Sequence, residues 1–297
     1  MKSTGTQSAF RRAQPAHRQS GISLIELLVG ITIGLLVVAV AAAALIASKG
    51  VTQSVSDNTQ LQQQASYLFR IIGQQIRQSG SIRLNLAANK GAAETIDPSD
   101  VVAFSPDTKT FGINAAYPAI GGSTNSTTKT DTLTTAYQNY FEPSFLSSDN
   151  VSSLRDCLGK QPAAGDENQV IQSNFSLAND RLMCSGLASS AAALADNVSD
   201  FQVRYLVQTG AAAGQPKLQK VAVNAVSDWS SVFGVEVCLV MYGTQKNDIP
   251  KDSKFTGCDS ENPITIGSDN TNLASAQKGK IHMTFRNVYL LRSQGLI

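Results

Sequence analysis

Residues 21–47 read GISLIELLVGITIGLLVVAVAAAALIA, a nearly unbroken apolar run that only Ser23, Glu26 and Thr32 interrupt. At ~1.5 Å of rise per residue, a helix from Ile22 to Ala47 would be about 39 Å long. The hydrocarbon core of a bilayer is only about 30 Å thick. The sequence therefore predicts a transmembrane helix over residues 22–47.

The charges around this run predict its orientation. Residues 1–21 contain four basic residues and no acidic one, which leaves 20 basic and 22 acidic residues in the rest of the chain. Positive charge before a membrane helix keeps that end in the cytoplasm, so we expect the remainder to be exported. A formal charge of −2 on that remainder gives no general attraction to nucleic acid, which we do not expect as a partner.

Two common explanations account poorly for the run. A secretory signal peptide has an apolar region of about 7–15 residues, which is shorter than this one. A plain signal anchor has no use for Glu26, because a carboxylate inside a membrane helix costs roughly 2.5–3.5 kcal/mol and usually marks a function. Glu26 therefore indicates that the helix does more than hold the chain in the membrane.

The stretch from Gly21 to Leu28 resembles the class III signal of type IV prepilins. The resemblance implies that prepilin peptidase cuts between Gly21 and Ile22 and then methylates the new amine of Ile22. It also implies that Glu26 is needed for filament assembly. Two features depart from the usual pattern, since the first mature residue is Ile rather than Phe and the leader of 21 residues is long.

The physical chemistry of the cleaved end agrees with this resemblance. After cleavage Ile22 carries a free amine at the membrane level, where the Glu26 carboxylate of a neighbouring subunit can pair with it. Two charges that are each costly in lipid then offset one another, which favours one fixed axial stagger between subunits. Gly30 and Gly34 form a G-x-x-x-G pattern, which fits either close helix packing or two tolerated small residues.

Beyond Lys49 the pattern becomes amphipathic, with apolar residues at three- and four-residue steps up to Ile76. We expect one helix of about 87 Å from Ile22 to Ser79, ended by Gly80. The expected fold class is α+β, a long N-terminal helix packed on a globular head with an antiparallel β-sheet. The expected organisation is a cleaved leader at 1–21, the helix at 22–80 and a periplasmic or extracellular head at 81–297.

Candidate strands in the head show apolar alternation or short apolar runs between turn residues. A stretch of Gly, Ser, Thr and Asn at 121–130 predicts a loop, and the polar stretch 243–263 predicts another. The candidate strands are 100–105, 130–135, 169–174, 201–208, 234–242 and 281–291.

All four cysteines lie in the C-terminal half, and none forms a C-x-x-C pair. An even number of cysteines in an exported chain predicts two disulfides, and four free thiols are the alternative. A zinc site is not expected, because the sequence lacks the closely spaced ligand pairs of structural zinc sites. Three connectivities are possible. We expect the local pairs Cys157–Cys184 and Cys238–Cys258, because the second would constrain the polar loop after residue 243 and nothing demands interleaved pairing.

The sequence offers little for catalysis, and we expect no enzyme activity, cofactor or metal site. Only His17 and His282 are present, and the first is lost with the leader. Two S-x-x-K patterns, at 126–129 and 275–278, stand in polar segments without companion motifs. Acidic clusters near residues 97, 166 and 269 lack the spacing of a calcium loop.

The head resembles the PilW-like minor pilins in three stretches, 194–205, Trp229 followed by 232–241, and 285–288, whereas 81–190 match no known pattern. This resemblance implies a minor pilin that joins other minor pilins in the inner membrane and primes polymerisation of the major pilin. It would then sit at the tip of an extracellular pilus, beneath an adhesin, with roles in adhesion and twitching motility. A pseudopilin of type II secretion, or a tip subunit that itself binds DNA or a surface, remains an alternative.

Overall fold

The computed structural model describes most of the chain, and the leader expected at 1–21 lies, apart from Gly21, outside the described residues. The chain divides into two compact units, Met1–Val51 and Thr52–Ile297, and each is described by itself. The described residues are 21–82, 84–85, 87, 89, 97–104, 118–143, 150–163, 170–187, 190–209, 217–246, 249–250, 252–259, 263–266 and 273–292.

Helix α1 runs from Leu24 to Gln78, close to the bounds expected from the sequence. Gly80, two residues beyond its end, has a φ of +74°. This left-handed conformation is the usual way for a glycine to end a helix, because glycine has no Cβ to clash. Ser81 then donates its backbone N–H to the carbonyl of Gln78, which closes the last turn.

In the first unit, every described residue of the helix is exposed. Its most apolar window has a mean hydropathy of 2.7, and none of that window is buried within the chain. By length and composition alone, the helix is suited to cross a membrane.

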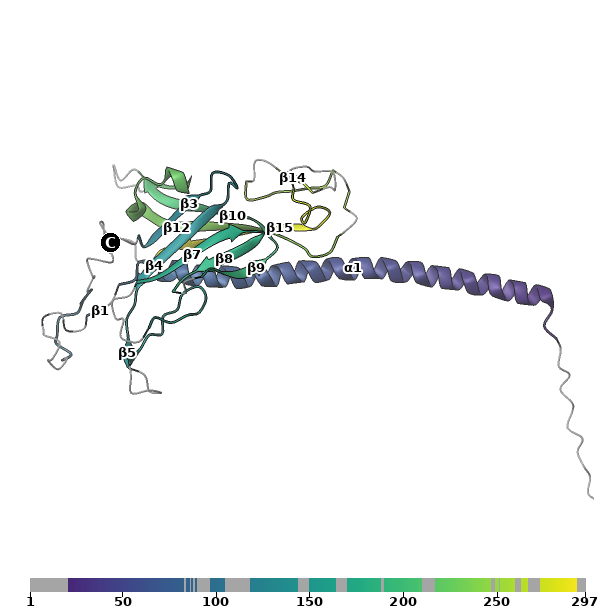
Figure 1. Cartoon of the computed structure of the whole chain (residues 1–297), viewed down its shortest axis with the longest axis horizontal. Helices are drawn as coiled ribbons and strands as arrows, with labels where there is room; N and C mark the ends of the chain where they lie inside the picture. The colour runs from purple at the N-terminus through teal and green to yellow at the C-terminus, as the bar shows by residue number, and fades with distance from the viewer. Residues whose placement is uncertain are drawn as a thin grey trace, which may run out of the picture. The chain divides into compact units, whose positions relative to one another are not determined.

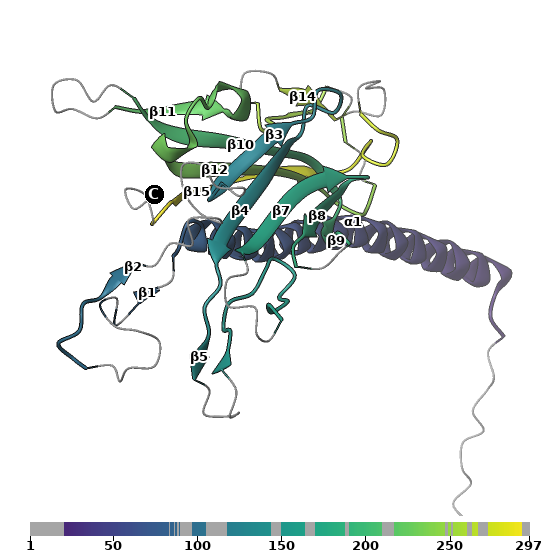
Figure 2. The same cartoon turned by 60° about the vertical axis from the view of Figure 1, so that its left-hand side comes forward.

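The second unit contains two antiparallel sheets beside the C-terminal half of α1 (Figures 1 and 2). The four-stranded sheet has the order β11 (Lys217–Ala222), β10 (Val198–Thr209), β12 (Val232–Tyr242) and β15 (His282–Leu290). The five-stranded sheet has the order β3 (Ile120–Thr124), β4 (Asp131–Gln138), β7 (Val170–Ala178), β8 (Arg181–Ser185) and β9 (Ala192–Asp196).

Short elements complete the head. Three two-stranded pairs are β1 (Leu84–Asn85) with β2 (Ala103–Phe104), β5 (Glu142–Pro143) with β6 (Asn150–Val151), and β13 (Lys254–Phe255) with β14 (Ile264–Thr265). The 3-10 turns η2 (Val223–Ala225) and η3 (Trp229–Ser231) lead from β11 into β12.

One hydrophobic core joins the helix to both sheets. Five buried helix residues at steps of three and four form the inner face of α1, namely Leu61, Ala65, Leu68, Ile72 and Ile76. This is the spacing that keeps side chains on one face of a helix. They share a single cluster with buried residues of the two sheets, including Leu133, Phe175, Val203, Tyr205, Val237 and Leu239. The α+β class expected from the sequence is thereby confirmed.

The predicted loop at 121–130 is wrong over its first four residues, which belong to β3. Gly121 and Gly122 suggested a loop, yet both stand where the backbone is approached closely. The hydroxyl of Tyr205 donates to the Gly121 carbonyl at 3.1 Å, and a Cβ at Gly122 would collide with that hydroxyl and with the Thr132 carbonyl. Glycine is needed here for close packing inside a strand. The candidate strand at 100–105 is also reduced, to Ala103–Phe104.

Gln75 is a buried polar contact between the helix and the five-stranded sheet. Its Nε2 donates to the Arg155 carbonyl at 3.1 Å, and its Oε1 accepts from the hydroxyls of Tyr137 at 3.2 Å and Ser173 at 2.9 Å. All three polar contacts are internal, so the buried amide is satisfied. Because hydrogen bonds are directional, these contacts hold α1 at one position along the sheet.

Asp57 makes a similar contact on the same helix, 18 residues before Gln75. Its buried carboxylate accepts from the Thr244 hydroxyl at 2.9 Å and from the Gln245 backbone N–H at 3.1 Å. A charge-assisted hydrogen bond of this kind is stronger than a neutral one. Asp57 therefore fixes the segment that follows β12 against the helix.

Replacing Gly73 with alanine should destabilise the head. A Cβ at Gly73 would overlap the ring of Tyr289, whose hydroxyl is held by the Phe69 carbonyl at 2.7 Å. Overpacking of this kind costs about 1–3 kcal/mol, and the better helix propensity of alanine returns only about 1 kcal/mol. We expect a lower unfolding midpoint for the full-length protein in detergent. Gly50→Ala is the control, since nothing lies within 4 Å of its added Cβ. Equal midpoints for the two variants would contradict the overlap.

Candidate functional site

The first turn of α1 is capped by Ser23. The Ser23 hydroxyl accepts the backbone N–H of Glu26 at 3.2 Å, and its carbonyl accepts that of Leu27 at 3.1 Å. This is the geometry of a helix N-cap. Ser23-x-x-Glu26 also matches the capping-box pattern, a signal of a helix start that is visible in the sequence. The cap starts the helix only two residues after Ile22, so the first residue after the expected cut lies next to the first turn.

Glu26 lies on an open side of the helix. With Ile22, Leu27, Gly30 and Ile31 it lines a groove of about 300 Å³. Ile22, Glu26 and Gly30 follow one another at four-residue steps and therefore share one face. The first turn is also the positive end of the helix dipole, which favours a carboxylate there. The structure thus brings together two of the residues singled out from the sequence.

Gly21 has no structural reason within this chain to be glycine. An added Cβ would meet nothing within 4 Å, and its φ is not in the left-handed range. Gly30 and Gly34 are equally open within the chain. A requirement for glycine at position 21 would therefore have to come from another molecule.

The four cysteines form the two sequence-local disulfides. Cys157 joins Cys184 on β8 with a Cα–Cα distance of 6.4 Å. Cys238 on β12 joins Cys258 with a Cα–Cα distance of 5.7 Å. The first ties the loop after β6 to the five-stranded sheet, and the second ties the segment after β13 to the four-stranded sheet.

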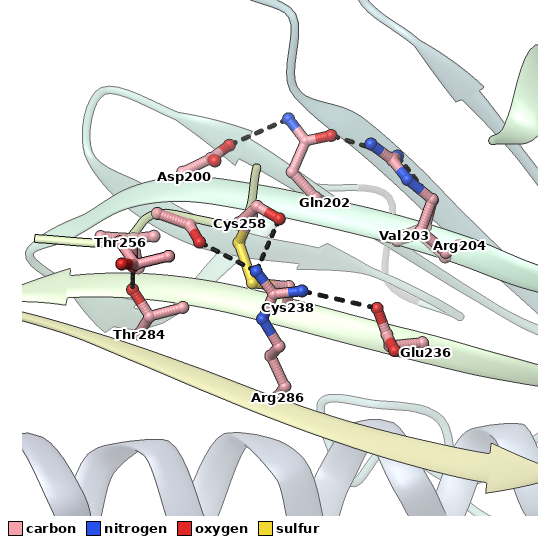
Figure 3. Close-up of a disulfide and its surroundings, with 12 residues drawn as sticks. Asp200, Gln202, Val203, Arg204, Glu236, Cys238, Thr256, Cys258, Thr284 and Arg286 are labelled. Carbon is pink, nitrogen blue, oxygen red and sulfur yellow. Dashed lines mark hydrogen bonds and ion pairs between the residues drawn. A yellow bond between two sulfur atoms is a disulfide. The ribbon is translucent and has the colours of Figure 1, made fainter. Parts of the chain in front are cut away.

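Arg286 supports the second disulfide from the neighbouring strand (Figure 3). Its Nη2 donates to the carbonyls of Gly257 at 2.9 Å and Cys258 at 2.7 Å. Its Nη1 lies 3.8 Å from Oε1 of Glu236 on β12. The segment that ends at Cys258 is therefore held by a guanidinium as well as by the covalent bond.

Removing this disulfide should cost about as much stability as its loop length suggests. The chain-entropy model gives about 3 kcal/mol for a loop of this size. We expect Cys238→Ser/Cys258→Ser to lose about 3 kcal/mol, because Arg286 keeps the segment ordered in the folded protein while the unfolded chain gains freedom. Adding Arg286→Gln should then cause a further loss larger than Arg286→Gln causes in the disulfide-bonded protein. Urea unfolding of the four proteins checks this, and strictly additive losses would contradict it.

His282 has a structural surrounding. Its ring stacks on Phe255 with centroids 4.7 Å apart, and its Nδ1 lies 3.0 Å from the Lys280 carbonyl. Burial lowers the pKa of the ring, so it is held neutral. Because the pKa of His282 is lowered in the folded protein, the unfolded chain binds the proton first. The free energy of unfolding therefore falls as pH drops from 6.5, the ordinary histidine pKa, toward the lowered folded value. The ring is thus part of the packing of the head.

The other chemical candidates do not come together into a site. Ser126 and Lys129 are exposed in the turn between β3 and β4, and Ser275 is exposed in the segment before β15. Among the described residues, no group of three or more His, Cys, Asp or Glu side chains could hold a metal ion.

Comparisons with known proteins point to the N-terminal segment. Residues 16–42 match the model of the prokaryotic N-terminal methylation motif. A solved structure, a type IV-like pilin from Thermus thermophilus, is similar at 16% identity over 59% of this chain and 86% of that chain, with a TM-score of 0.31. The comparison with curated proteins finds no significant match.

The motif contains Gly21, Ile22 and Glu26, and it implies processing by prepilin peptidase. It is followed by an exposed apolar helix and by a head of antiparallel sheets. The N-terminal segment of the chain is therefore similar to that of type IV prepilins and pseudopilins, and it precedes a helix suited to cross a membrane.

Proposed function

We propose that the chain is a minor pilin of a type IV pilus, similar to the PilW-like branch, that helps to prime pilus assembly. The observation that carries this proposal is the methylation motif at residues 16–42 together with Glu26, the one charged residue between Ile22 and Ser48. In this proposal the chain is cut between Gly21 and Ile22, and Ile22 is N-methylated.

Assembly then depends on the first turn of α1. The Ser23 cap places Glu26 one turn from the mature amine, on the groove that Ile22 and Gly30 also line. The amine of Ile22 from one subunit would pair with Glu26 of the next. Neither charge can stay unpaired in lipid without a cost of several kcal/mol, so the pairing selects one stagger between neighbouring helices.

The head favours a minor subunit over the major one. Major pilins are usually about half as long as this chain, and the resemblance to PilW-like minor pilins covers the helix and three stretches of the C-terminal hundred residues. Those stretches lie within β9, β10, η3, β12 and β15, and three of these five elements belong to the four-stranded sheet.

The proposed partners follow from this role. Before assembly the chain is a single-pass protein of the inner membrane with its head in the periplasm, and afterwards it is part of the extracellular pilus. It meets prepilin peptidase first, then the other minor pilins and the major pilin, and at the tip an adhesin. Nucleic acid is not among these partners, because the chain from Ile22 onward has a net negative charge.

Deletion of the gene in the source bacterium tests the proposal. We expect surface filaments to fall at least tenfold and to return when the full-length chain is restored. The chain should also be found in sheared filaments at a small fraction of the amount of the major pilin. Normal filaments together with a block in protein secretion would instead identify a pseudopilin.

A further inference from the structure

A hollow of about 400 Å³ lies in the second unit, between α1 and the head. Three elements surround it, the stretch of α1 from Tyr67 to Gln75, the loop 155–159 and strand β9. Its apolar part is formed by Ile71, Leu158 and Leu194, which are partly buried and packed against the main core. Exposed polar side chains surround that part. An apolar centre with a polar rim is the usual anatomy of a protein interface.

Strand β9 gives this hollow a backbone edge. It is the last strand of the five-stranded sheet, and no other strand pairs with it in the part of the chain that the structure describes. The register with β8 shifts between the pairs Leu182–Ala195 and Met183–Ala193, which leaves Leu194 as a bulge residue without a partner across the ladder. The bulge weakens this edge as a template, so an added strand would pair with the residues of β9 on either side of Leu194.

Two arginines give the hollow a positive charge. Arg70 and Arg155 both line it and both are exposed. Across the described ranges, no carboxylate lies within ion-pair distance of either guanidinium, and the Arg155 Nη1 has only the Gly159 carbonyl at 3.4 Å. The hollow therefore offers two guanidinium groups that are free to bind carboxylates.

The one acidic residue in the lining, Asp156, lowers the formal charge of the lining to +1 but does not form an ion pair with either arginine. Asp156 is buried, and its Oδ1 accepts the backbone N–H groups of Leu158 at 2.9 Å and Lys160 at 2.8 Å. Its Oδ2 accepts that of Leu187 at 2.7 Å. The Asp156 carboxylate thus holds the loop that forms one wall of the hollow. Both of its oxygens already accept backbone N–H groups of the chain.

The loop that carries Arg155 is fixed before anything binds. The Arg155 carbonyl accepts from Gln75 at 3.1 Å and from the Tyr137 hydroxyl at 2.5 Å. The next residue but one, Cys157, is held by its disulfide and donates its backbone N–H to Ser173 at 3.0 Å. A partner that meets a preformed surface pays less ordering entropy on binding.

We propose that this hollow receives an extended acidic segment of another filament subunit, which adds along the edge of β9 and places carboxylates against Arg70 and Arg155. This inference rests on the proposed function, which supplies the neighbouring subunit. A nucleic-acid strand fits less well, because such a site needs a track of cations with several stacking aromatics. Here Tyr67 is the one aromatic residue in the lining.

Site-specific crosslinking tests the inference in the full-length chain in the source bacterium. A photoreactive amino acid replaces Ala193, an exposed residue of β9 in the lining. We expect an adduct with a different pilin-like subunit, at a peptide that contains Asp or Glu. Adding Arg155→Glu should reduce the adduct at least tenfold. Lys217→Glu, a charge reversal on β11 of the other sheet, should leave it unchanged.

A charge reversal in the partner shows whether a lost adduct reflects the lost ion pair or a misfolded variant. Replacing the acidic residue of the crosslinked partner by Lys should restore the adduct with Arg155→Glu. No adduct at Ala193, an adduct with a peptide that lacks acidic residues, or equal adducts with Arg155→Glu and Lys217→Glu would each overturn the inference. Binding of fluorescein-labelled single-stranded DNA that is lost in Arg70→Glu would also overturn it, in favour of nucleic acid.

The same strains separate this inference from the proposed function. Sheared filaments are probed for the chain in every variant. If the chain is present in filaments but gives no adduct, the inference fails and the proposed function stands. If the chain is absent from filaments even when Arg155 is unchanged, the proposed function fails.

Discussion

Replacing Gly21 with valine should leave essentially all of the protein uncleaved in the inner membrane. In the proposed function, prepilin peptidase cuts after Gly21, so we expect this residue to enter a pocket of the peptidase that excludes a branched side chain. A steric clash within the chain would not explain such a block, because a Cβ at Gly21 meets nothing within 4 Å in the chain itself. Gly21→Ala, with one added methyl group, should be cleaved slowly.

Intact-mass measurement of the membrane-extracted protein decides the outcome. The unaltered chain should give a species that begins at Ile22 and carries one methyl group, whereas Gly21→Val should retain the leader. Gly34→Ala is a matched control, because it stands in equally open surroundings within the chain. A mature protein that begins at any residue other than Ile22 would refute the cleavage site.

The second large effect is expected for Glu26→Ala, which should be cleaved and inserted normally but reach filaments at least tenfold less often. The variant loses the carboxylate that would pair with the amine of the neighbouring Ile22. It keeps the start of the helix, because the hydrogen bond to Ser23 uses the backbone N–H of residue 26. Glu26→Gln should behave in the same way, since it keeps the shape of the side chain but loses its charge.

Ser23→Ala separates the cap from the charge. Loss of an N-cap costs about 1 kcal/mol of helix stability, which a long helix in a membrane can tolerate. We therefore expect Ser23→Ala to be assembled nearly as well as the unaltered chain. The variants are compared by immunoblotting of sheared filaments and of membranes. Normal incorporation of Glu26→Ala would rule out the pairing.

Much of the architecture could be predicted because its signals are local. The apolar run, the amphipathic spacing up to Ile76 and the glycine at position 80 are each visible within a few residues. Together they predict both ends of the helix to within two residues. Strands β10 and β12 could also be predicted, because the first alternates and the second is strongly apolar. Strand β9 was missed because Ala192–Asp196 has no β-branched or aromatic residue and owes its conformation to pairing with β8.

The two candidate sites differ in the same way. The N-terminal segment could be predicted from its residues, apart from the Ser23 cap. The hollow could not, because Arg70 and Arg155 are far apart in the chain. The contacts of the Arg155 carbonyl with Gln75 and Tyr137, together with the Cys157–Cys184 disulfide, bring the two arginines to one surface.

The contacts of Asp57 and Gln75 also determine how the head carries a mechanical load. The two residues lie on one helix at a separation of about 27 Å along its axis, and each is bonded to a different part of the head. A pull along the axis shears both groups of hydrogen bonds at once, so neither can be peeled away before the other is strained. On the Asp57 side the bonded residues, Thr244 and Gln245, lie between Cys238 and Cys258, and the covalent ring limits how far that segment can be drawn out.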